Sequence, residues 1–248
     1  MTRDLNRYEA EYLSDYGFER TMVSYRHQFL MERMKLLRPD TIWEIGCGPE
    51  LLCAAFQSRG GRFLEWIAIE PIESFCRRAR EAGVPNLQVL HGTAEDWLPR
   101  LAIRLPAPDY IICSGLLHEV SSADEMLGAI VNAMGPNTIL HVNVPNAKSL
   151  HRVLAVEMGI ISHEAELGKR NRSLQQTAVY DARQLAEAMV KAGLRITCEG
   201  GFMLKPFPHA MMEQIRPYLG EQVLDGLYGL GKRRPELSAE IFIEAARN

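Results

Sequence analysis

Two short apolar segments, each followed by residues suited to ligand binding, constrain the fold most strongly. The first, residues 41–45, runs directly into a turn that contains Gly46 and Gly48. The second, residues 64–69, ends at Glu70, which follows Gly48 by 22 residues. In a strand–helix–strand unit the two strands are parallel neighbours, so the glycine turn and the acid lie at the same end of the sheet. A nucleoside can lie across such a turn and offer its ribose hydroxyls to the acid.

The glycine turn departs from the dinucleotide fingerprint G-x-G-x-x-G in a way that bears on the ligand. Leu51 occupies the position of the third glycine, which normally lets a helix N-terminus approach a pyrophosphate. Glu44, two residues before Gly46, fits poorly beside a diphosphate but well beside an ammonium group. These departures favour S-adenosylmethionine (SAM), which carries a sulfonium and an amino-acid tail but no phosphate.

Several segments in this order resemble the motifs of class I SAM-dependent methyltransferases. Residues 44–48 (Glu-x-Gly-x-Gly) resemble the first motif of that family, and Glu70 resembles its ribose-binding acid. Residues 92–97 resemble the segment that contacts adenine, and residues 109–120 resemble the fourth strand and the loop after it. The resemblance covers residues 40–145 and implies SAM as the cofactor. The cofactor contacts that it implies are Glu44, Gly46, Gly48, Glu70, Thr93, Ala94, Glu95 and Ser114. Pro49 and Glu50 depart from the small residue often found there.

Apolar residues at helical spacing over residues 5–37 predict two N-terminal helices, divided at Gly17 and ended by Pro39. In the resembled family such helices often cover the cofactor pocket. Arg26 would then pair with the methionine carboxylate of SAM. The alternative is a surface arginine on an amphipathic helix.

The remaining pattern predicts an α/β fold with a doubly wound, seven-stranded, mostly parallel sheet. Near-continuous apolar strands separated by helices indicate parallel strands covered on both faces. The expected strands are residues 41–45, 64–69, 87–90, 109–113, 138–144, 195–198 and 241–245, the last two forming an antiparallel edge in the resembled fold. Helices are expected over residues 147–158, 181–192 and 210–219.

We expect one methyltransferase domain over residues 1–248, with a helical lid in front of the core and a helical insertion near the C-terminus. Its parts are an N-terminal cap (1–38), a SAM-binding core (40–145) and two substrate-side insertions (146–180 and 202–235). Insertions on a shared core commonly set substrate specificity.

The composition of the chain restricts the classes of binding partner and the cellular compartment that we expect. The net charge of −3 gives no global field that would attract nucleic acid or an anionic membrane. No apolar run of membrane-spanning length and no signal-peptide pattern occur. The five cysteines are scattered, without metal-ligand spacing. We therefore expect a cytoplasmic protein with no metal, no nucleic-acid partner and no membrane association, while its oligomeric state stays open.

Methyl transfer needs alignment, exclusion of water and a route for the proton of the acceptor. His118 is the first candidate base, because the loop after the fourth strand faces the reactive methyl group in the resembled family. Its alternative role is that of a helix-start residue without proton transfer. Glu119 is the second candidate.

A small-molecule acceptor is expected, with a hydroxyl preferred over an amine. The loop after the fourth strand lacks the N/D-P-P-Y/F signature of family members that methylate nucleic-acid bases and glutamine. Residues 144–152 are similar to methyltransferases of bacterial glycan and natural-product pathways. The candidate acceptor contacts are Asn143, Asn146, His151, Tyr180 and His209.

Two other functions stay open at this point. An NAD(P)-dependent oxidoreductase is disfavoured by Leu51 and Glu44. A SAM-fold protein that binds without catalysis would share every motif above.

Overall fold

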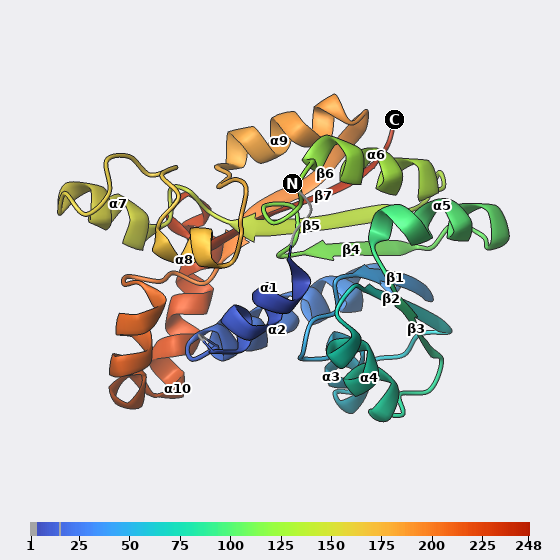
Figure 1. Ribbon diagram of the computed structural model, residues 1–248, viewed down its shortest axis with the longest axis horizontal. Coiled ribbons are helices and arrows are strands. Elements are labelled where there is room, and N and C mark those ends of the chain that lie inside the picture. The colour runs from blue at the N-terminus through green and yellow to red at the C-terminus, as the bar shows by residue number, and fades with distance from the viewer. Residues whose placement is uncertain (1–3, 15) are drawn as a thin grey trace.

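The computed structural model describes residues 4–14 and 16–248, and a seven-stranded sheet forms its centre (Figure 1). The strand order is β3-β2-β1-β4-β5-β7-β6. The first five strands pair in parallel, and β7 runs antiparallel to both of its neighbours. The strands are β1 Thr41–Ile45, β2 Glu65–Glu70, β3 Leu87–His91, β4 Tyr110–Ser114, β5 Ile139–Pro145, β6 Leu194–Phe202 and β7 Glu240–Arg247. The predicted fold class is confirmed.

Helices cover both faces of the sheet, and each face has its own apolar core (Figure 1). Helices α5, α6 and α9 pack through residues such as Leu98, Leu127 and Leu185 on one face. Helices α2 and α3 pack through Met34 and Phe56 on the other. The helices are α1 Leu5–Ser14, α2 Glu19–Leu37, α3 Leu52–Ser58, α4 Glu73–Glu81, α5 Ala94–Arg104, α6 Ala123–Ala133, α7 Leu150–Glu157, α8 Lys169–Ser173, α9 Ala182–Lys191 and α10 His209–Arg233, with a 3-10 turn at Pro235–Leu237.

Helices α2 and α10 meet around a third core beside β6 and β7. Phe18 and Phe29, from the start and middle of α2, are buried against Phe202, Met212 and Tyr228. The two N-terminal helices are divided as predicted, since α1 ends before Gly17 and α2 begins after it. Burial of this apolar surface holds α2 and α10 against the antiparallel edge of the sheet formed by β6 and β7.

Two helices differ from their predicted bounds. The helix predicted over 147–158 begins only at Leu150, because the Asn146 side chain accepts a hydrogen bond from the backbone N–H of Lys148 and favours a turn. The helix predicted over 210–219 continues to Arg233, with a kink where Gly220 takes φ 65° and ψ 163°. The helix at 181–192 is confirmed as α9, capped by Asp181, whose side chain accepts from the backbone N–H of Gln184.

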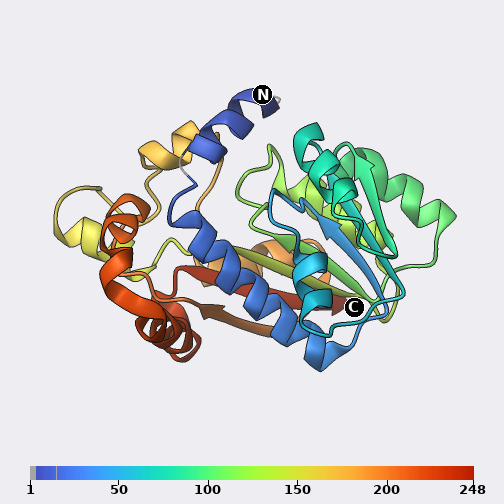
Figure 2. The same ribbon diagram turned by 90° about the horizontal axis from the view of Figure 1, so that it is seen from below.

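The segments outside the core gather at one side of the molecule. Helices α7, α8 and α10 lie together beyond the ends of β4 and β5 (Figure 1). The view from below shows α2 across one face of the sheet and α1 beside α8 (Figure 2). Within the described residues, no helix combines the length and the apolar character needed to cross a bilayer.

Candidate functional site

A cavity of about 740 Å³ lies at the carboxyl ends of the parallel strands. Its lining comes from the glycine turn after β1, the end of β2, the loop after β4, the two N-terminal helices, α7, α8 and the start of α10. The switch point of this doubly wound sheet lies between β1 and β4. From β1 the chain continues to β2 and β3 on one side, and it then crosses over to β4 and β5 on the other side. The cavity therefore lies where the fold is expected to bind a ligand.

The glycine turn has backbone conformations that favour glycine. Gly46 has φ +76° and Gly48 has φ +61°, in the left-handed region that other residues rarely adopt. The backbone N–H of Gly46 donates to the carbonyl of Ile69 at 2.8 Å, which fastens the turn to β2. A Cβ built on Gly48 would meet no atom within 4 Å, so this side of the turn is open to a ligand.

Glu70 ends β2 and is 3% exposed. One of its carboxylate oxygens accepts from the backbone N–H of Gly48 at 3.0 Å, and the other accepts from that of Ile72 at 2.9 Å. These two bonds fix the plane of the carboxylate beside the glycine turn. Because each carboxylate oxygen can accept more than one hydrogen bond, the group remains able to bind ribose hydroxyls.

Glu44 lies inside β1 and is buried. One carboxyl oxygen accepts from the indole N–H of Trp66 at 2.9 Å. Burial, together with the charge of Glu70, raises the pKa of Glu44 to about 8. A buried carboxyl group on the wall of a cavity fits a ligand that brings a positive charge.

The segment predicted to contact adenine does not reach the cavity. The Thr93 side chain accepts from the backbone N–H of Asp96 and caps α5, while Ala94 and Glu95 form its first turn. The wall next to Glu70 is instead lined by Pro71, Ile72 and Phe75. The sequence pattern did not single out these residues, although an apolar pair soon after a ribose-binding acid is a detectable signal.

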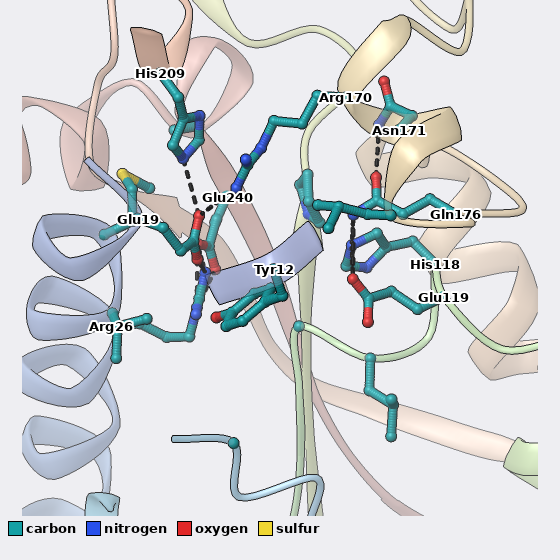
Figure 3. Close-up of a pocket in the computed structure, with 18 of the residues that line it drawn as sticks. Tyr12, Glu19, Arg26, His118, Glu119, Arg170, Asn171, Gln176, His209 and Glu240 are labelled. Carbon is teal, nitrogen blue, oxygen red and sulfur yellow. Dashed lines mark hydrogen bonds and ion pairs between the residues drawn. The ribbon is translucent and has the colours of Figure 1, made fainter. Parts of the chain in front are cut away.

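Arg26 is held between two carboxylates (Figure 3). Its guanidinium donates to both oxygens of Glu240 at 3.0 and 3.1 Å and to Glu19 at 3.1 Å. Glu240 also accepts from the side-chain amide of Asn143 at 2.6 Å. Arg26 lines the cavity, so its interpretation as a surface arginine is wrong. Its charge is already compensated within the chain, a partnership that the sequence did not reveal.

His118 and Glu119 lie in the loop after β4, and both line the cavity (Figure 3). His118 is 4% exposed, and its Nε2 lies 3.1 Å from Nε2 of Gln176. The same amide donates to Glu119 at 3.1 Å. Ser114, at the end of β4, also lines the cavity, and among the described residues its buried hydroxyl has no hydrogen-bond partner.

The predicted acceptor residues divide into two groups. Asn146, His151 and His209 line the cavity, whereas Asn143 and Tyr180 do not. Asn143 is fully buried and its amide is bound to Glu240. Tyr180 forms an isolated β-bridge with Asn146.

Sequence reasoning named His209 but missed Glu19 and Lys205, which form a chain of polar contacts with it on the cavity wall. His209 Nε2 lies 2.9 Å from a carboxylate oxygen of Glu19, and Lys205 Nζ lies 2.8 Å from His209 Nδ1. Burial, followed by the charge of Lys205, lowers the pKa of His209 to about 4, so the imidazole is neutral. Burial also lowers the pKa of Lys205 to about 7. Only a fold that joins α2 to the start of α10 brings these groups together.

A methyltransferase-domain family model matches residues 17–199. The chain belongs to the class I SAM-dependent methyltransferases. Among curated proteins none matches it. The predicted family and cofactor are thus confirmed, and the interpretation as a nicotinamide-dependent oxidoreductase is wrong.

Solved structures share the fold at low sequence identity. A SAM-dependent methyltransferase from Mesorhizobium loti is 15% identical, with a TM-score of 0.56, over 87% of this chain and 96% of that one. The plantazolicin methyltransferase BamL, in a complex with SAH, is 13% identical, with a TM-score of 0.58, over 98% and 97%. The [4+2]-cyclase SpnF is 16% identical, with a TM-score of 0.55, over 90% and 80%. A protein named for cyclisation thus shares this fold, so the fold alone does not fix the reaction.

The residues that line the cavity suit SAM, independently of the family match. Gly48 leaves an open approach, Glu70 has an oriented carboxylate, and Glu44 offers a buried acid suited to an ammonium group. The buried hydroxyl of Ser114 supplies a further polar group. No feature of this turn resembles a pyrophosphate site, because Leu51 precedes α3 where a glycine would be needed.

Proposed function

We propose that this enzyme methylates a small-molecule acceptor, with a hydroxyl preferred over an amine. One observation carries the proposal: the cavity that is lined by Glu44, Gly48 and Glu70 is also lined by His118, Glu119 and Asn146. The walls beyond the glycine turn come from the substrate-side segments 146–180 and 202–235 and from the cap. Such a cavity suits an acceptor that enters between these segments.

SAM supplies an electrophilic methyl group on a sulfonium whose departure leaves a neutral sulfide. The chain must therefore align the acceptor, exclude water and receive a proton. Gly48 and Glu70 position the nucleoside, and Glu44 stabilises the ammonium group of the tail. The N-terminal tyrosines of α1 that line the cavity, Tyr8 and Tyr12, limit the access of water.

We further propose that His118 takes the proton of the acceptor. When the Gln176 amide donates to Nε2 of His118, that nitrogen is the basic one. An acceptor hydroxyl that replaces Gln176 would then find a base at hydrogen-bond distance. Glu119 accepts from the same amide and is the alternative proton acceptor.

Two variants test the two halves of the cavity separately. Glu70→Ala removes the ribose-binding acid, so the affinity for SAM and for S-adenosylhomocysteine should fall in parallel by about 2–4 kcal/mol. His118→Ala should leave SAM affinity within a few-fold and lower turnover by about 10²–10⁴. Calorimetry gives the affinities, and transfer of labelled methyl from SAM to a panel of hydroxyl and amine compounds gives the turnover.

The outcomes separate the assignments. Normal SAM affinity in Glu70→Ala would contradict the cofactor site. Normal turnover in His118→Ala, at unchanged stability, would remove the base role. Transfer to amines alone would contradict the preference for a hydroxyl.

We also propose a cytoplasmic location, supported by five cysteines that are all free thiols.

A further inference from the structure

Basic side chains gather on one wall of the cavity. They come from the start of α7 (His151 and Arg152), from α8 (Arg170), from the connection between β6 and α10 (Lys205) and from the first residue of α10 (His209). Arg170 and His209 lie on the same side of the Glu19–Arg26–Glu240 cluster in Figure 3. None of these elements contributes to the glycine turn or to the end of β2. The basic wall therefore belongs to the part of the cavity beyond the cofactor residues.

Among the cations of this wall, and within the residues that the structure describes, Arg170 is paired with a carboxylate whereas Lys205 is not. Glu240 is bound by Arg26 and Asn143, and Glu19 is bound by Arg26, by His209 and, at 3.4 Å, by Arg170. Within residues 4–14 and 16–248, Lys205 has no carboxylate at ion-pair distance, and its hydrogen-bond partner is the neutral ring of His209.

The guanidinium group of Arg152 hydrogen-bonds to backbone carbonyl groups rather than to a carboxylate. Its guanidinium donates to the carbonyl oxygens of Glu164 and Glu166, both at 2.5 Å. These bonds hold the charge of Arg152 beside the cavity without cancelling it. The amino group of Lys205 and the guanidinium group of Arg152 thus line one cavity without carboxylate contacts of their own among the described residues.

Lys205 and His151 have the geometry of ligand donors. Lys205 is 3% exposed, and one of its three N–H groups is needed for His209 Nδ1, which leaves two for a ligand. Nδ1 of His151 is buried and has no partner among the described residues. Burial, followed by the neighbouring charge of Lys205, lowers the pKa of His151 and disfavours its charged form. The fold therefore keeps basic groups together at a cost that an anion would relieve.

We propose that Lys205 and His151 bind an oxyanion, a carboxylate or a phosphate, carried by the methyl acceptor. The site rests on the proposed function, because it assigns this oxyanion to the acceptor and not to the cofactor. A bound oxyanion favours the ammonium form of Lys205, which donates two hydrogen bonds to it, and Nδ1 of His151 donates one in the tautomer that carries its proton there. Arg152 adds charge at longer range. The acceptor is thus a small anionic molecule, held by its oxyanion while its methylated group faces His118.

The test uses the whole chain saturated with S-adenosylhomocysteine, with inorganic phosphate and acetate as the probes. Saturation with this ligand fills the carboxylate site of the cofactor tail, so anion binding that persists belongs elsewhere in the cavity. Calorimetric titration should show binding of at least one of the two anions. The preferred anion tells whether the acceptor carries a phosphoryl group or a carboxylate.

Variants locate the binding. Lys205→Met should weaken binding of the preferred anion by about tenfold to a hundredfold, because hydrogen bonds to charged groups are lost. Lys191→Met is the matched control, since Lys191 is an exposed lysine of α9 paired with Asp124, and its anion affinity should equal that of the wild type. His151→Phe removes the second donor and keeps Lys205, so it should weaken anion binding by about threefold or more. This variant provides the test if Lys205→Met does not fold.

The affinity for S-adenosylhomocysteine, measured in the same samples, separates the two proposals. Cofactor binding without anion binding, or equal anion affinity in the wild type and the cavity variants, would overturn the oxyanion site alone. Anion binding that disappears on saturation with S-adenosylhomocysteine would assign the basic wall to the cofactor carboxylate and also overturn it. Absence of cofactor binding would contradict the proposed function itself.

Discussion

The charge of Glu44 should change when the cofactor binds, which makes this residue a sensitive probe of the cofactor site. Burial and the charge of Glu70 raise the pKa of Glu44 to about 8, so the carboxyl group of the free protein is mostly protonated at pH 7. An ammonium group beside Glu44 favours the carboxylate. Binding of SAM at pH 7 should therefore release about one proton, which calorimetry in buffers of different ionisation enthalpy measures.

The affinity for SAM should depend on pH with a defined sign. Since the ligand prefers the ionised carboxylate, affinity should rise with pH by up to about tenfold per unit below the pKa of about 8, and then level off. Glu44→Gln still offers an acceptor to Trp66 and resembles the protonated acid, so it should bind SAM more weakly and without this rise. The amino group of SAM also titrates, but its contribution is common to both proteins and cancels in their difference.

The stability of the free protein provides an independent check on Glu44. Its pKa in the folded protein lies above the ordinary value of 4.5, so its stabilising contribution is complete below about pH 4.5 and is lost as pH rises to about 8. Relative to Glu44→Gln, the wild type should lose about 1.4 kcal/mol of unfolding free energy per pH unit in this window. Urea unfolding at pH 5 and pH 8 measures the loss, about 3–5 kcal/mol in all. No proton release at pH 7, or identical pH profiles in the two proteins, would refute the reasoning.

Two further predictions concern packing and ligand-induced order. Gly231→Ala should cost about 3 kcal/mol of unfolding free energy, because its Cβ would lie 2.4 Å from the backbone nitrogen of Met203. Gly229→Ala, in the same helix with nothing within 4 Å, should be neutral or stabilising in chemical denaturation, and equal losses in both variants would contradict the packing argument. SAM should slow hydrogen exchange in α1, which buries none of its residues, and in segment 162–176, and equal exchange with and without SAM would contradict a lid role.

The glycine turn and Glu70 could be placed together from the sequence because short stretches encode them, whereas the predicted adenine contacts Thr93, Ala94 and Glu95 do not line the cavity. The apolar residues of β1 lead into a turn where Gly46 and Gly48 are required by positive φ, and such a turn is recognisable from neighbouring residues. The contact between Glu70 and Gly48 spans 22 residues, within one strand–helix–strand unit whose geometry is fixed. In this region the local sequence pattern and the tertiary fold favour the same conformation, so the pattern alone predicts it.

The prediction of α10 shows where local reasoning stopped too early. Gly220 breaks the helical φ and ψ angles, and from sequence alone a glycine soon after Pro217 marks a helix end. In the folded protein the helix resumes because Tyr228 and Leu224 pack against the third core, together with Phe202 and Met212. Tertiary burial outweighs the local cost of the glycine, and nothing in residues 210–219 reports that burial.

The acceptor half of the site depends on contacts between residues that are far apart in the chain. Arg26 meets Glu240 across 214 residues, and His209 meets Glu19 across 190. Both carboxylates are buried, and the carboxylate of Glu240 on β7 is compensated by Arg26 only when α2 lies against β7. The contacts that place the N-terminal cap therefore also place charged groups in the acceptor half of the cavity. A family resemblance built on local motifs can identify a methyltransferase, whereas the residues that choose its acceptor become visible only when the chain is folded.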